Sequence, residues 1–191
     1  MHTTDAGLVF SATDLSHFLA CPHLTRLDRA EALGLGPKRP VFDDPATEVL
    51  RKRGLEHEHA YRARLEAEGR DVVAIEHPER GAPTAQRWTT LAGATLDAMR
   101  GGADVLYQGC LFDGTWLGFP DFLVRVDQPS DLGPWSYDIV DTKLAREAKG
   151  GALLQLCSYA DLLTQVQGVA PSRLHLVLGG PTPRTESFRL A

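Results

Sequence analysis

The sequence predicts one mixed α/β domain, in which helices flank a mixed central sheet. The chain has 191 residues, of which 43% are hydrophobic and 24% are charged, the balance of a globular protein. Segments with helical periodicity alternate along the chain with short apolar segments that have the length of strands. No internal repeat or low-complexity segment interrupts this pattern, so one domain over residues 1–191 is expected.

Two helices are predicted in the first part of the chain. The segment SATDLSHFLACPHL begins with Ser11 as a plausible N-cap, and its helix should stop near Pro22. A longer helix should start after Asp44, with Pro45 in its first turn, and end at Gly69. These signals divide the domain into an N-terminal helical segment, at about 10–40, and a core, at about 45–191.

The core should alternate strands and helices. The segment 103–126 is expected to form two strands joined by a tight turn at Asp113-Gly114. A polar loop, DQPSDLGPW, separates it from the next strand. Further strands are expected at 71–77, 136–145, 172–180 and 186–191, and further helices at 84–102 and 151–166.

Composition excludes several classes of protein. The formal net charge is -5, and no basic tail or stripe indicates nucleic-acid binding by itself. The N-terminus does not resemble a signal peptide, and no apolar run is long enough to span a membrane. Three widely spaced cysteines suit reduced thiols, so a cytoplasmic location is expected. Neither a glycine-rich phosphate loop nor a GxSxG motif is present.

An acid and a base interrupt the predicted strand SYDIVDTKLA. Asp141 and Lys143 are two residues apart, so their side chains leave the same face of the strand. Placing charges in an apolar strand costs several kcal/mol per ion. An ion pair on an edge strand is one explanation, and a functional site is the other.

A second acid lies among apolar residues at Asp121, within GFPDFLVRV. It could simply end a turn after Pro120. Together with Asp141 on a neighbouring strand, it would supply two carboxylates, and Mg²⁺ prefers such oxygen ligands. Lys143 beside such a site could act on an attacking water or on phosphate charge, which favours phosphodiester hydrolysis.

Two helices add candidate residues. On the helix that starts after Asp44, His57 shares a face with Tyr61, whereas His59 should point to solvent. On the helix at 151–166, Gln155 and Tyr159 share a face. His57 and Tyr159 could equally be ordinary core residues.

The ordered motifs GLEH, GFPD, DTK and QLCSY resemble those of RecB-like nucleases in the PD-(D/E)XK superfamily, which includes CRISPR-associated iron–sulfur exonucleases. The segment FSATDLSHFLACPHL is similar to the N-terminal segment of that group. The resemblance implies a restriction-endonuclease-like core that cuts DNA with Mg²⁺ or Mn²⁺, in repair, recombination or defence, in some relatives with a fused helicase. Asp141 stands where glutamate is commoner, which would bring the metal closer to the strand.

The resemblance also implies residue functions. Asp121, Asp141, His57 and the main-chain carbonyl of Thr142 would hold the metal, and Lys143 would act on the attacking water. Gln155 and Tyr159 would position substrate. A DNA-binding module that does not cut is the alternative function.

The resemblance further implies that Cys21 is one ligand of a [4Fe–4S] cluster, which takes four thiolates. The other three ligands would lie beyond Ala191, so the chain is expected to be the N-terminal domain of a longer protein. A small buried cysteine is the alternative for Cys21. A zinc-structured interaction domain using Cys21, His23, His57 and His59 is disfavoured, because the two helical histidines point apart.

Overall fold

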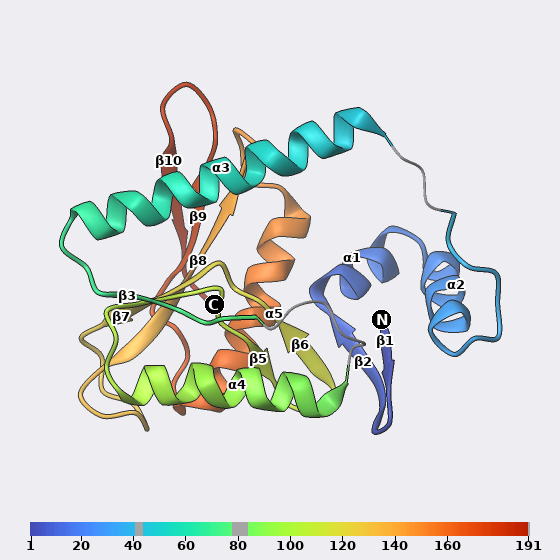
Figure 1. Cartoon of the computed structure of the whole chain (residues 1–191), viewed down its shortest axis with the longest axis horizontal. Coiled ribbons are helices and arrows are strands. Elements are labelled where there is room, and N and C mark those ends of the chain that lie inside the picture. Colours follow the sequence, from blue (N-terminus) through green and yellow to red (C-terminus); the bar gives the residue numbers. More distant parts are fainter. Residues whose placement is uncertain (41–43, 78–83, 191) are drawn as a thin grey trace.

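A six-stranded mixed sheet forms the centre of the protein in the computed structural model, which describes residues 1–40, 44–77 and 84–190 (Figure 1). The strand order is β10-β9-β8-β7-β4-β3. The central strand β8 pairs antiparallel with β7 and parallel with β9. The bounds of these strands are β3 (Val72–Ala74), β4 (Val105–Tyr107), β7 (Phe122–Val126), β8 (Ser136–Lys143), β9 (Leu174–Leu178) and β10 (Arg184–Phe188).

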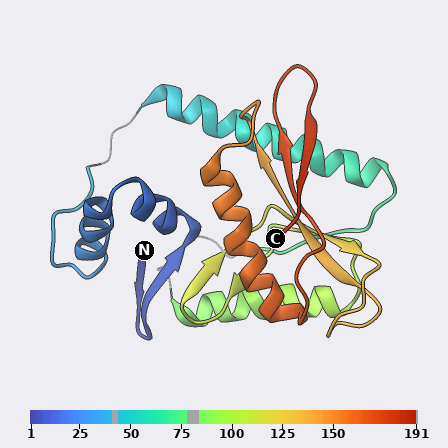
Figure 2. The same ribbon diagram turned by 180° about the vertical axis from the view of Figure 1, so that it is seen from behind.

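Helices cover both faces of this sheet. On one face, α3 (Pro45–Ala67) packs Leu65 and Tyr61 against a small apolar cluster that includes Phe122 and Val140. On the other face, α4 (Ala85–Arg100) and α5 (Gly150–Gln167) enclose the larger core cluster. Figure 2, seen from behind, shows α5 lying across the sheet. The predicted α/β architecture is therefore confirmed.

A second sheet was not expected from the sequence, which predicted a single one. Its order is β1-β2-β6-β5, with bounds β1 (His2–Thr4), β2 (Gly7–Ser11), β6 (Trp116–Gly118) and β5 (Leu111–Phe112). The predicted turn at Asp113-Gly114 does join β5 to β6, and Gly114 has a φ of 99°. However, each predicted strand of the hairpin is divided in two. The halves next to the turn, β5 and β6, belong to this second sheet, whereas β4 and β7 belong to the central one.

The N-terminal segment also contains more structure than expected. Ser11 caps α1 (Ala12–Ala20) through a capping box with Asp14, as its position predicted. A second helix, α2 (Pro22–Ala32), begins directly after Cys21, because Pro22 ends one helix but suits the first position of the next. The strands β1 and β2 were not predicted; they form a local hairpin, and β2 also pairs with β6, more than a hundred residues away in the sequence.

The other helix signals are confirmed. The Asp44 side chain accepts a hydrogen bond from the Ala46 amide at 3.0 Å and caps α3. Gly69 has a φ of 81°, which a glycine adopts without strain where the chain leaves that helix. The strand predicted at 186–191 is found as β10, which starts two residues earlier and ends at Phe188. Residue 191 lies outside the described part of the chain.

Candidate active site

Asp121 lies at the break between β6 and β7, directly before the first residue of β7 in the central sheet. The Asp121 carbonyl accepts a hydrogen bond from the Gln108 amide at 2.8 Å, so the two breaks lie side by side. Gln108 has a φ of 58°, the left-handed region that a residue with a side chain seldom adopts. Such backbone strain is concentrated at functional sites. The Gln108 side-chain amide donates a hydrogen bond to Glu58 on α3, which ties that helix to the break.

The Asp121 carboxylate is held by Thr142 on β8. Its Oδ2 accepts hydrogen bonds from both the amide and the hydroxyl of Thr142, each at 2.7 Å. Burial, followed by the charges of Asp141 and Glu58, raises the pKa of Asp121 to about 7, although the Thr142 hydrogen bonds oppose the rise. The acid is thus fixed in place at an electrostatic cost.

Asp141 and Lys143 share one face of β8, as their spacing predicted, and form an ion pair there, inside the sheet instead of on the edge strand of the alternative explanation. The Asp141 carboxylate is 1% exposed, whereas the Lys143 side chain is 32% exposed. Apart from this ion pair, neither Asp141 oxygen has a hydrogen-bond partner in the described part of the chain. Burial raises the pKa of Asp141, and the Lys143 ammonium opposes that rise only in part. The strand therefore carries a buried carboxylate whose hydrogen-bonding capacity is largely unused.

The helix α5 brings Gln155 and Tyr159 to the same place. The Gln155 amide donates a hydrogen bond to the Tyr159 hydroxyl at 2.6 Å, as expected for residues four apart. Burial raises the pKa of Tyr159 to about 12, with further contributions from the charges of Asp141 and Asp121. Gly118 permits this approach, because a Cβ there would lie only 2.7 Å from Tyr159 Cδ1.

On α3, His57 and Glu58 face different parts of the sheet, and the function of His57 as a metal ligand stays a prediction. His57 Nε2 lies 3.0 Å from the main-chain oxygen of Val177, over β9. The neighbouring Glu58 is the residue whose charge raises the pKa of both Asp121 and Asp141. One residue corresponds to about 100° around a helix, so the face that packs on the sheet and the face toward the acids are adjacent but distinct. His59 is exposed, as predicted, with its ring 6.5 Å from that of Tyr107.

Glu58 was not among the site residues predicted from the sequence, although the segment GLEHEH contains it. Its signal was its position on α3, one residue from the candidate histidine. The interaction of Glu58 with Gln108 could not be read from the sequence, because the two residues are fifty positions apart.

These acids are candidate ligands of a divalent cation, although the oxygens of Asp121, Asp141 and Glu58 do not all lie within 4.8 Å of one another. Three carboxylates, from Asp121, Asp141 and Glu58, oppose the single ammonium of Lys143, and the two aspartates have raised pKa values. A cation would relieve both the mutual repulsion and the unused oxygens of Asp141. The Thr142 amide and hydroxyl orient Asp121, while a ligand function for its carbonyl stays a prediction.

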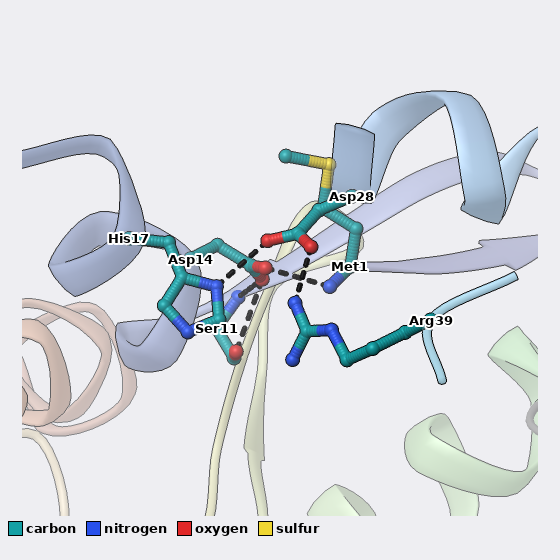
Figure 3. A network of polar contacts seen from close by, with 6 residues as sticks. All are labelled: Met1, Ser11, Asp14, His17, Asp28 and Arg39. Carbon is teal, nitrogen blue, oxygen red and sulfur yellow. Dashed lines mark hydrogen bonds and ion pairs between the residues drawn. The ribbon is translucent and has the colours of Figure 1, made fainter. Parts of the chain in front are cut away.

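A second polar cluster lies in the N-terminal segment, formed by Asp14 and His17 of α1 and Asp28 of α2 (Figure 3). Among the residues that the structure describes, this is the only set of three potential ligands whose atoms all lie within 4.8 Å of one another. A cavity of about 490 Å³ opens beside it. The sequence analysis did not predict it, because the contact between the two helices brings these residues together.

The carboxylates of this cluster already have partners (Figure 3). The amino group of Met1 lies 2.6 Å from Asp14, and Arg39 forms an ion pair with Asp28. Burial opposes ionisation of Asp28, but hydrogen bonds from His17 and Arg39 hold its pKa below the usual range. The cluster is therefore explained as a set of ion pairs that ties the N-terminal strand to both helices.

The three cysteines are free thiols that form no disulfide bond with one another. Cys21 is exposed at the start of α2, Cys157 is exposed on α5, and Cys110 is buried. Within residues 1–40, 44–77 and 84–190, no group of three metal-ligating side chains includes a cysteine. The zinc-structured alternative therefore has no support, and the iron–sulfur function of Cys21 stays a prediction.

No protein-family model matches the chain, and a search of curated proteins also finds no match. None of the helices in the described residues is both long enough and apolar enough to cross a membrane. Any assignment of function must therefore come from the residues themselves.

Proposed function

We propose that the chain is a metal-dependent nuclease, with a RecB-like PD-(D/E)XK core, that hydrolyses phosphodiester bonds in DNA. One observation carries the proposal. Asp141 lies buried and Asp121 half-buried at the ends of neighbouring strands, both have raised pKa values, and Asp141 has no partner besides Lys143 in the described part of the chain. A fold gains no stability from carboxylates placed in this way, so a function is the simplest reason for them.

The proposed chemistry adds water across a P–O bond of the DNA backbone. Bound to Asp121 and Asp141, Mg²⁺ or Mn²⁺ would favour deprotonation of the water and offset the phosphate charge. Lys143 would donate hydrogen bonds from its ammonium group to the attacking oxygen or to the phosphate, where negative charge develops. Glu58 would add charge that favours cation binding, through its influence on both aspartates.

The surrounding residues would position these groups. Thr142 fixes the rotamer of Asp121 through two hydrogen bonds, so this carboxylate is preorganised. The hydrogen-bonded pair of Gln155 and Tyr159 would face the substrate strand from α5. These are positioning functions, and none requires proton transfer by the phenol, whose pKa of about 12 disfavours ionisation.

DNA cleavage by the purified chain tests the proposal. End-labelled DNA is incubated with Mg²⁺, Mn²⁺ or EDTA, with wild-type protein and with the Asp141→Asn and Lys143→Ala variants. The matched control is Asp161→Asn, which changes an exposed aspartate on α5. Wild type and control should cut only with metal, and the two site variants should not.

Two results would overturn the proposal. Equal cleavage by wild type and Asp141→Asn would show that the activity comes from elsewhere. DNA binding by the wild type without cleavage in either metal would favour a binding module instead.

A further inference from the structure

Gln108 lies between β4 and β5 in a backbone conformation that favours glycine. Its φ is 58°, in the left-handed region, whereas Gly109 directly after it has no positive φ. A glycine at position 108 would adopt this conformation without strain. The chain carries a glutamine there instead, which indicates that the side chain has a use.

Hydrogen bonds hold the backbone of this residue from both sides. The Gln108 amide donates to the Asp121 carbonyl at 2.8 Å, and the Gln108 carbonyl accepts from His77 Nε2 at 2.8 Å. Directly before it, the Tyr107 carbonyl accepts from the Ile75 amide at 3.0 Å. Strained backbone persists only where its surroundings determine it in this way. The segments around His77 and Asp121 therefore fix the direction in which Gln108 projects its side chain.

The Gln108 side chain reaches Glu58 on α3. Its amide nitrogen donates a hydrogen bond to Glu58 Oε1, and the contact is partly buried. An ionised carboxylate has about four acceptor sites, so this bond leaves Glu58 able to bind a cation or a water on that cation. Because a hydrogen bond to a charged group is stronger than one between neutral groups, it restricts the rotation of the Glu58 carboxylate.

One residue therefore contacts two of the three acids in the candidate active site. Gln108 binds Glu58 through its side chain and Asp121 through its main chain, so it helps to set the distance between these acids. Since the oxygens of the three acids do not all lie within 4.8 Å of one another, Glu58 would act on the cation through one of the waters that Mg²⁺ retains in protein sites. Holding Glu58 in advance strengthens such binding, because a mobile side chain would lose conformational entropy when the cation binds.

We propose that Gln108 is a positioning residue of the cation site, which holds Glu58 in the orientation that a metal ion bound by Asp121 and Asp141 requires. This inference rests on the proposed nuclease function, whose site it shares. Loss of the group that hydrogen-bonds a metal-site carboxylate typically lowers metal affinity by about 10- to 100-fold. The left-handed backbone then has a purpose, because it aims the side chain at α3 while the main chain stays bonded to Asp121.

Unfolding in urea, measured in EDTA, tests the contact between Gln108 and Glu58 without any metal. Gln108→Met keeps the length of the side chain but removes its donor, and Glu58→Ala removes the acceptor. In a double-mutant cycle, the double variant should raise the equilibrium constant of unfolding by about tenfold less than the product of the two single effects. Independent effects of the two substitutions would show that the bond contributes nothing in solution and would overturn the inference.

Mn²⁺ affinity, measured by calorimetry, tests the positioning. Gln108→Met and Gln108→Asn should each bind Mn²⁺ about tenfold more weakly than wild type. Asparagine tolerates the left-handed region and is one methylene shorter, so it keeps the backbone but does not reach Glu58. The matched control, Gln165→Met, changes an exposed glutamine on α5 and should bind like wild type. In a Glu58→Ala background, Gln108→Met should change the affinity by less than about twofold, whereas a residue that only stabilises the fold would weaken binding in both backgrounds.

DNA cleavage by the wild type with Mn²⁺ is measured beside these titrations, so that the inference and the proposed function can fail separately. Wild-type affinity in folded Gln108→Met and Gln108→Asn would overturn the inference, even if the wild type cuts DNA. Mn²⁺ binding that depends on Gln108, in a wild type that does not cut DNA, would leave the inference standing and contradict the nuclease function. A wild type that binds no Mn²⁺ would contradict both.

Discussion

Replacing Asp121 by asparagine should stabilise the metal-free protein at neutral to alkaline pH while abolishing cleavage. In the folded state the pKa of Asp121 rises from 3.8 to about 7. At 1.36 kcal/mol per unit of pKa, ionised Asp121 costs at most about 4 kcal/mol of folding free energy. Asparagine removes this charge, and its carbonyl oxygen can still accept both hydrogen bonds from Thr142.

The pH dependence of this gain has a definite sign. The folded protein keeps the Asp121 proton up to about pH 7, whereas the unfolded chain loses it near pH 4. The unfolded state therefore binds fewer protons between these values, and wild-type stability falls as the pH rises through this window. The stabilisation by Asp121→Asn should be near zero at pH 4, grow up to pH 7 and then stay constant.

Urea unfolding in EDTA at several pH values measures this effect. The matched control is Asp138→Asn on the neighbouring strand β8. Asp138 is 2% exposed, and despite its burial, the nearby His175 ring and the hydrogen bonds from Ser172 hold its pKa below the usual range. The control should therefore destabilise the protein above pH 4. A destabilising Asp121→Asn at pH 8 would refute the reasoning and identify Asp121 as a structural residue.

Three further predictions follow from the site and its packing. Lys143→Ala should lower the rate of DNA cleavage by about 10²–10⁴ without loss of helical circular dichroism. Glu58→Gln should weaken Mn²⁺ binding, measured by calorimetry, because it removes a charge that acts on both aspartates; unchanged affinity would exclude Glu58 from the site. Gly118→Ala should lower the free energy of unfolding in urea by about 1–3 kcal/mol, because its Cβ would overlap Tyr159. Its control, Gly93→Ala, adds a Cβ in open space on α4 and should raise the free energy of unfolding by about 0.5–1 kcal/mol.

Local signals in the sequence predicted local structure well. The caps at Ser11 and Asp44 and the turn at Asp113-Gly114 were all found where expected, because each depends on a few neighbouring residues. The spacing of Asp141 and Lys143 likewise predicted that they share a face, since a strand places alternate side chains on one face, and there they form an ion pair. These are consequences of backbone geometry alone.

Features that depend on distant contacts were missed. The second sheet exists because β2 pairs with β6, which draws the hairpin away from the central sheet and exposes the breaks at Gln108 and Asp121. Whether His57 or Glu58 faces the acids depends on how α3 packs on the sheet, where Tyr61 contacts Phe122. A rotation of one residue along the helix changes which side chain faces the acids, and helical periodicity alone cannot fix it.

Mn²⁺ binding, followed by electron paramagnetic resonance, tests the central claim most directly, because the protein has two clusters that could hold a cation. Wild type is titrated beside Asp141→Asn and His17→Ala, one variant for each cluster. If Asp121 and Asp141 form the metal site, Asp141→Asn should lose the bound Mn²⁺ signal, and His17→Ala should keep it. Retention in Asp141→Asn with loss in His17→Ala would place the metal at the N-terminal cluster and contradict the proposed active site.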